Sequence, residues 1–280
     1  MCIDGDCPSE GLDRRTFLAG SASAFVGLGA LGLEPARHAQ TQWPTRVLDH
    51  PSIQYGPVTF THAGKETFDG FLARPKAEGV YPAVLVIAGN RITEEYIPNT
   101  CAALAVAGFV GLAPNIFHPL PDSARTREEM NAALKEHTDY DVLEDVQVGA
   151  DYLERQRFVR RAGMGVIGFC FGGRIAMLHG SRSRNIDAVV PFHPGPVTAA
   201  EIARLRVPVQ VHSGSADRQV SVAAITELER TLRAQSTPVE VFLYEGADHG
   251  FLAYTRPTYK PDAAQLASKR TTEFLTRNLK

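Results

Sequence analysis

A cysteine has a glycine two residues before it and another two residues after it in the stretch Gly168-Phe169-Cys170-Phe171-Gly172. The stretch follows an apolar run that begins at Met164 and precedes a helical pattern, so it predicts a strand, a sharp turn and a helix. Such a turn strains its central residue and holds the side chain outward, and crowding there favours glycine two residues away on either side. The thiol of Cys170 is therefore a candidate nucleophile, and it needs a nearby base because the thiolate is the reactive form.

An acid and a base follow two later strands of the pattern. Asp217 lies after the predicted strand that ends at His212, and His249 lies after the one that ends at Tyr244. Reactive groups gather at the carboxyl ends of strands in an open parallel sheet, so both should lie near Cys170. The chain order of nucleophile, acid and base is that of the α/β-hydrolase triad. The pattern predicts that Asp217 orients His249 and that His249 activates the thiol.

Several of these positions have competing interpretations. Cys170 could instead be a structural cysteine buried in the core. Asp248 could orient the imidazole, although it neighbours His249 in the chain and should point elsewhere. His193 and His212 lie inside or directly after strands, so we expect both to be hydrogen-bonded core residues. His249 is the last histidine in the chain, so a triad in this order has no other base.

Acyl transfer also needs hydrogen-bond donors for the oxyanion of its tetrahedral intermediate. One donor is expected to be the backbone N–H of Phe171, the residue after the nucleophile. The second should come from the loop after the strand that ends at Ala88, where Gly89 and Asn90 stand. The amino-terminal end of the helix that begins near Gly172 should also favour the thiolate.

These residues must be positioned by a mostly parallel sheet. The run from Ala83 to Ala88 is continuously apolar, which is typical of a strand buried on both faces. Short alternating runs at 58–61 and 68–73 predict an antiparallel pair at a sheet edge. Other strands are predicted at 109–113, 164–169, 188–192, 207–212 and 239–244, and helices at 95–107, 139–157, 221–234 and 262–278, besides the helix after the cysteine. The sequence therefore predicts a three-layer α/β-hydrolase fold, a mostly parallel central sheet with helices on both faces, in one domain over residues 43–280.

The first 39 residues resemble a twin-arginine export signal. Arg14 and Arg15 precede a weakly hydrophobic run to Leu33, and Ala39 is a small residue at a cleavage position. We expect cleavage by the export machinery and a periplasmic or secreted protein without stable membrane insertion. The run is too short and too rich in glycine to span a membrane. An amphipathic first helix is the other interpretation, but the run shows no polar face of helical period.

Composition limits the partners. The chain has 280 residues, of which 44% are hydrophobic, enough to bury a large core. Its formal net charge of -2 provides no basic field for nucleic acid or an anionic membrane, so we expect neither as a partner. The cysteines show no Cys-x-x-Cys spacing, so no zinc or thioredoxin-like site is predicted. Cys101 falls in a helical pattern and is expected to be a small buried residue.

Three segments together resemble the motifs of the dienelactone hydrolase family. They are residues 168–173 with their cysteine, residues 214–217 with Val220, and Asp248-His249-Gly250-Phe251. The order of strands and helices from 57 to 279 is similar too. The resemblance implies hydrolysis of a small ester or lactone through an acyl-thioenzyme, without metal or organic cofactor. It implies that Cys170 is the nucleophile, His249 the base and then the acid, and Asp217 its orienting partner.

Two positions depart from that family. Its members usually carry a glutamate directly after the strand equivalent to 84–88, which contacts the cysteine and gates its ionisation, but this chain has Gly89. Members that act on carboxylated lactones hold the carboxylate with arginines, one of them four residues after the histidine, where this chain has Ala253. We therefore expect a different gating mechanism and a substrate other than dienelactone. Arginines that could supply positive charge to a substrate are Arg91, Arg125, Arg127 and, near the missing position, Arg256.

Two functions besides hydrolysis stay open on the sequence. The fold could serve as a catalytically silent module that binds a small carbonyl compound. Cys170 could also have a redox role, although no resolving cysteine stands in the same motif. Ester hydrolysis by the protein and by variants of Cys170 distinguishes these functions.

Overall fold

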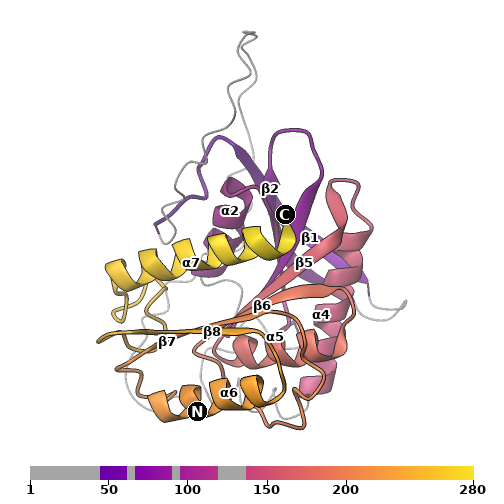
Figure 1. Ribbon diagram of the computed structural model, residues 1–280. Helices are drawn as coiled ribbons and strands as arrows, with labels where there is room; N and C mark the ends of the chain where they lie inside the picture. Colours follow the sequence, from indigo (N-terminus) through magenta and orange to yellow (C-terminus); the bar gives the residue numbers. More distant parts are fainter. Residues whose placement is uncertain (1–44, 62–66, 90–94, 119–136) are drawn as a thin grey trace.

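The computed structural model of the protein describes residues 45–61, 67–89, 95–118 and 137–280. Within them, an 8-stranded sheet has the order β1-β2-β4-β3-β5-β6-β7-β8 (Figure 1). β1 pairs with β2, and β2 with β4, in antiparallel fashion, and all other neighbouring pairs are parallel. The strands are β1 (Ile53–Thr61), β2 (Thr67–Pro75), β3 (Tyr81–Ile87), β4 (Val110–Pro114), β5 (Val159–Phe169), β6 (Ile186–Phe192), β7 (Val209–Gly214) and β8 (Val239–Tyr244).

Helices cover both faces of this sheet, which gives three layers (Figure 1). α2 (Tyr96–Val106) and α7 (Pro261–Leu279) lie on one face. The other face is covered by α4 (Asp139–Glu154), α5 (Phe171–Arg182) and α6 (Val222–Ala234). The layered fold and the antiparallel edge pair predicted from the sequence are thus confirmed. None of the helices in the described part of the chain has the length and apolar character needed to cross a membrane.

The centre of the sheet is the core of the domain. Every residue from Ala83 to Ala88 is fully buried, because β3 has a strand on each side and a helical layer on each face. α4 begins with a capping box, in which the side chains of Thr138 and Asp141 each accept the other's backbone N–H. The helix then packs an apolar stripe toward β3 and β4, formed by Val142, Val146, Ala150 and Leu153.

Hydrogen bonds move several boundaries from their predicted positions. β5 begins at Val159 rather than Met164, because Val159 pairs with Tyr81 before an irregularity in the register. α4 ends at Glu154 rather than at 157, because the backbone N–H of Arg155 donates to the carbonyl of Tyr152 in a tighter turn. The apolar pattern alone does not reveal either bond.

Glycine allows the backbone segments at the end of β5 to pack closely. A Cβ on Gly168 would lie 2.0 Å from the carbonyl oxygen of Gly172, and a Cβ on Gly172 would lie 2.3 Å from that of Ile87. A Cβ on Gly89, after β3, would lie 2.5 Å from the carbonyl oxygen of Phe169. A side chain at any of these positions would push β3, β5 and α5 apart.

We predict that Gly168→Ala lowers the free energy of unfolding by roughly 2 kcal/mol or more, because the added methyl must displace backbone. Gly56→Ala is the matched control, since a Cβ at Gly56 on β1 meets no atom within 4 Å. Urea unfolding of both variants measures the difference. Equal stability of the two variants would contradict the close packing at Gly168.

Candidate active site

Cys170 occupies the turn between β5 and α5 with a strained backbone, φ 55° and ψ -115°. Such angles cost a residue with a side chain on the order of 1–3 kcal/mol. The backbone N–H of Cys170 donates to the carbonyl of Phe192 at 3.0 Å, and its own carbonyl accepts from Gly173 and Gly195 at 3.0 and 3.1 Å. These bonds to β6, to its following loop and to α5 maintain the strain. The thiol, which forms no disulfide, is half-buried at the carboxyl edge of the sheet.

The structure brings His249, from the loop after β8, together with Asp217, from the loop after β7. Nδ1 of His249 lies 2.9 Å from Oδ2 of Asp217. The other carboxylate oxygen accepts the backbone N–H groups of Gln219 and Val220 at 2.8 and 2.9 Å. The Asp217 side chain is fully buried, so its orientation is fixed by these contacts. His249 also lies beside the Cys170 thiol, with one ligand atom of each within 4.8 Å of the other, and Nε2 is the imidazole nitrogen that does not meet Asp217.

The thiol and the imidazole shift each other's pKa. Burial raises the pKa of Cys170, but hydrogen bonding to His249, the charge of that imidazole and the backbone N–H of Phe171 lower it by more, so the net shift is downward. Burial lowers the pKa of His249, but hydrogen bonds to Asp217 and Cys170, together with their charges, raise it to about 9. Both shifts favour a thiolate beside an imidazolium at neutral pH.

Backbone groups lie directly against the thiol. The backbone N–H of Phe171, the first residue of α5, lowers the pKa of the thiol. Gly89 also lies close to Cys170, since a Cβ on Gly89 would lie 2.9 Å from the Cβ of Cys170. A side chain at position 89 would require the turn between β5 and α5 to shift. Four residues considered from the sequence lie outside the described residues: Asn90, Arg91, Arg125 and Arg127.

The expectation for His193 was wrong. We expected a hydrogen-bonded core residue, but its Nδ1 has no hydrogen-bond partner among the described residues, and its ring centre lies 4.2 Å from that of His249. Burial lowers the pKa of His193 well below its ordinary value, and the charges of His249 and Arg256 lower it further. His193 is therefore a neutral neighbour of the imidazolium. It directly follows β6, so the rule that located Asp217, a polar residue after a parallel strand, could have found it.

The side chains of Cys170, His193 and His249 could together bind a thiophilic metal ion. One ligand atom from each of Cys170, His193 and His249 lies within 4.8 Å of the other two. Thiolate and imidazole are ligands that suit zinc and copper. Such an ion would bind both the thiol of Cys170 and the imidazole of His249.

The competing residues are engaged elsewhere. His212 is fully buried, and its Nδ1 lies 2.8 Å from Oη of Tyr244, so it is the hydrogen-bonded core residue that we expected. Asp248 accepts from the guanidinium of Arg218 at 2.9 and 3.1 Å and from the backbone N–H of His249 at 2.7 Å. Its carboxylate therefore binds a surface arginine instead of the imidazole ring.

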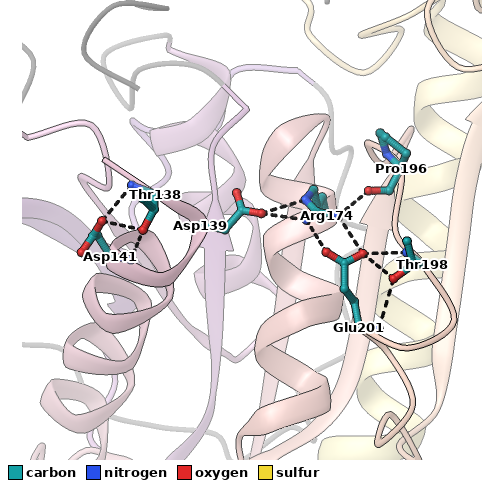
Figure 2. A network of polar contacts seen from close by, with 7 residues as sticks. All are labelled: Thr138, Asp139, Asp141, Arg174, Pro196, Thr198 and Glu201. Carbon is teal, nitrogen blue, oxygen red and sulfur yellow. Dashed lines mark hydrogen bonds and ion pairs between the residues drawn. The ribbon is translucent and has the colours of Figure 1, made fainter. Parts of the chain in front are cut away.

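A polar network holds α5 to its neighbours (Figure 2). Arg174 donates to Oδ2 of Asp139 at 2.7 Å and to Oε1 of Glu201 at 2.6 Å, and it also donates to the carbonyl of Pro196. Hydrogen bonds from Arg174 and from Thr198 lower the pKa of Glu201 to about 2. Arg174 thus joins the start of α4 and the loop after β6 to the helix that follows the nucleophile.

Arg256 brings positive charge close to the site. Its guanidinium lies 5.6 Å from the centre of the Tyr96 ring, and its charge acts on His193. Ala253, four residues after His249, is only 2% exposed and offers no polar group. Arg256 is therefore an arginine of this loop whose charge reaches the site.

Comparisons with known proteins agree on one family. Residues 68–279 match the model of the Dienelactone hydrolase family. A Bradyrhizobium sp protein named "Probable 2-oxo-3-(5-oxofuran-2-ylidene)propanoate lactonase" is 32% identical over 218 residues, which cover 73% of this chain and 87% of that protein. A Yersinia pestis protein named "Putative carboxymethylenebutenolidase" is 27% identical over 240 residues, which cover 81% of this chain and 89% of that protein.

A solved structure supports the same fold. The Klebsiella pneumoniae protein described as "Putative Dienelactone Hydrolase" matches with a TM-score of 0.75 and 24% identity, over 80% of this chain and 99% of that one. The region that matches the family model contains Cys170, Asp217 and His249. The chain therefore belongs to the dienelactone hydrolase family, and it is a hydrolase of the ester and lactone class.

Proposed function

We propose that the protein hydrolyses small carboxylic esters or lactones, with Cys170 as nucleophile, His249 as base and Asp217 as the carboxylate that orients the base. The observation that carries this proposal is the contact of 2.9 Å between His249 and Asp217 beside a thiol of lowered pKa. The names of the two relatives, a lactonase and a carboxymethylenebutenolidase, support the substrate class.

Acylation is the first half-reaction. The thiolate of Cys170 attacks the carbonyl carbon, a C–S bond forms, and the π electrons of the carbonyl move to its oxygen. The tetrahedral intermediate expels the alkoxide, which takes the proton from Nε2 of the His249 imidazolium. An ester releases its alcohol at this point, whereas a lactone opens and keeps its new hydroxyl on the acyl group. The result is an acyl-thioenzyme beside a neutral imidazole.

Deacylation restores the enzyme. Water gives a proton to Nε2 of His249 while its oxygen attacks the thioester carbon. The second intermediate expels the thiolate, which leaves the carboxylic acid as product and the imidazolium beside the sulfur. Asp217 stays ionised throughout and stabilises the imidazolium.

Backbone donors bind the oxyanion in both steps. The N–H of Phe171 is one donor, and we propose that Gly89 or Asn90 supplies the second. The positive end of the α5 dipole lies at the same place and adds to the favourable field. The absence of a side chain at Gly89, which lies against Cys170, keeps this face of the nucleophile open to the carbonyl group.

The site lacks two charged side chains that members of the family use with dienelactone. Ala253 stands where relatives that bind carboxylated lactones use an arginine, and Gly89 stands in place of the gating glutamate. We infer that Cys170 is paired with His249 before the substrate binds. A neutral ester or lactone therefore suits this site better than a carboxylated lactone.

We predict that Cys170→Ala lowers kcat/KM for ester and lactone substrates by roughly 10⁴-fold or more, because the covalent route is lost. The variant should keep the wild-type circular dichroism spectrum and unfolding midpoint. A panel of activated esters and small lactones measures the activity. In the wild-type protein, mass spectrometry after rapid quenching should detect the acyl group on Cys170.

Two results would count against this mechanism. Undiminished turnover by Cys170→Ala would exclude the cysteine as the nucleophile. If the wild-type protein formed no acyl-enzyme with any ester while its thiol stayed titratable, the chain would instead be a silent binding module.

We predict that iodoacetamide alkylates Cys170 at pH values well below about 8.5, the ordinary pKa of a thiol, because the imidazolium stabilises the thiolate. Cys101, which is fully buried and whose pKa burial raises strongly, should stay unlabelled in the folded protein. Asp217→Asn removes a charge that raises the pKa of His249, so the labelling profile of Cys170 should move to higher pH. Peptide mass spectrometry at a series of pH values follows both cysteines, and an unchanged profile in Asp217→Asn would refute the coupling.

We also propose that residues 1–39 are a twin-arginine export signal and that the mature protein is periplasmic or secreted. Replacing both Arg14 and Arg15 by lysine should retain the protein in the cytoplasm at its uncleaved mass. Fractionation of a bacterial host, followed by intact-mass analysis, reads out both effects. Equal export of the wild-type and the lysine variant would argue against the signal.

A further inference from the structure

Two histidines and an aspartate form a second polar cluster that the proposed hydrolysis does not use. His118 follows β4, His137 lies just before α4, and Asp145 lies on α4. Nε2 of His118 and Nε2 of His137 each lie 3.1 Å from the same oxygen, Oδ2 of Asp145. One ligand atom of each residue lies within 4.8 Å of the other two. The three side chains thus converge on one point from three segments of the chain.

Packing holds these side chains in place. Their exposed fractions are 10% for His118, 14% for His137 and 9% for Asp145. The His118 ring stacks on Phe68 with centroids 4.7 Å apart and planes 16° apart. It meets the His137 ring nearly at a right angle, 82°, at 5.7 Å. The two imidazoles therefore approach the carboxylate oxygen in different planes, as ligands around a shared ion do.

The charge in the cluster is suited to a cation. Asp145 presents one carboxylate oxygen to both imidazoles, and the three polar atoms face one another inside the packed cluster. A buried carboxylate is costly unless an opposite charge or several donors compensate for it. A divalent cation bound between the three side chains supplies that opposite charge.

The spacing also matches a coordination sphere. In a tetrahedral zinc site with bonds of about 2.0–2.2 Å, neighbouring ligand atoms lie roughly 3.3–3.6 Å apart. The two separations of 3.1 Å between imidazole nitrogen and carboxylate oxygen need little adjustment to reach this range. Imidazole nitrogen and carboxylate oxygen are both ordinary ligands of zinc.

We propose that His118, His137 and Asp145 form a binding site for a divalent transition metal ion, for which Zn²⁺ is the best match. Three protein ligands leave a fourth position for water or another ligand. The bound ion links the residues on both sides of 119–136 to α4. Phe117, next to His118, packs on Phe171 with ring centres 6.3 Å apart. The residue that precedes the proposed ligand His118 therefore contacts the start of α5. We therefore assign it a stabilising role and expect it to act independently of the chemistry at Cys170.

The test uses the full-length, untagged chain with Cys2→Ser, Cys7→Ser and Cys170→Ala. These changes remove the other thiols, apart from the fully buried Cys101, and with them the competing cluster around the nucleophile. After equilibration with Zn²⁺ and dialysis against metal-free buffer, elemental analysis should find one zinc ion per chain. Added Zn²⁺ should raise the unfolding temperature of this chain, and chelation should reverse the rise.

Ligand variants in the same background locate the ion. His137→Gln and Asp145→Asn should each retain no stoichiometric zinc and show no thermal shift with it. His50→Gln should behave like the background, because His50 is a surface histidine that contacts Ser52 instead. If His137→Gln or Asp145→Asn fails to fold, Co²⁺ added to the background chain should give the visible absorption of a nitrogen and oxygen site without a thiolate charge-transfer band.

Two results would overturn the proposal. One is a background chain that retains no zinc and shows neither the thermal shift nor the cobalt spectrum. The other is a folded His137→Gln or Asp145→Asn variant that retains as much zinc as the His50→Gln control.

Discussion

Three backbone segments meet around Cys170 at distances that leave no room for side chains: the loop after β3, the end of β5 and the start of α5. Gly89, Gly168 and Gly172 make this approach possible, and the approach forces the cysteine into its strained turn. Strain of this kind persists only where the surroundings over-determine it. Here the carbonyl of Phe192 and the N–H groups of Gly173 and Gly195 hold the backbone of Cys170 in this conformation. The thiol is therefore held at the sheet edge by backbone alone.

The loops after β7 and β8 then supply the charges that a fixed thiol needs. Burial by itself would make both the thiolate and the imidazolium unfavourable. Contact between the two, together with the buried carboxylate of Asp217, reverses that preference. Two backbone N–H groups hold the Asp217 carboxylate in place, so little reorganisation is needed when the imidazole of His249 gains or loses a proton. Neutral His193 packs against the imidazolium without competing for the carboxylate.

The remaining polar groups secure the elements that carry this site. Arg174 joins α5, the start of α4 and the loop after β6 in one network. The cluster of His118, His137 and Asp145 joins α4 to the chain on both sides of residues 119–136. Both sets lie on elements near Cys170, yet none of the contacts described for them involves the thiol. Their contacts fix the positions of α4 and α5.

The sequence by itself determined the α/β fold, the edge hairpin and the candidate residues Cys170, Asp217 and His249, because each depends on local features: apolar runs, glycine spacing and order along the chain. Asn90 and Arg91 stay predictions, since they lie outside the described residues. Only the tertiary structure decided that His193 packs on His249 and that His118 and His137 share one carboxylate oxygen. It also decided how far each pKa moves. These properties depend on burial and on distances between side chains from separate segments, and no spacing along the chain encodes either.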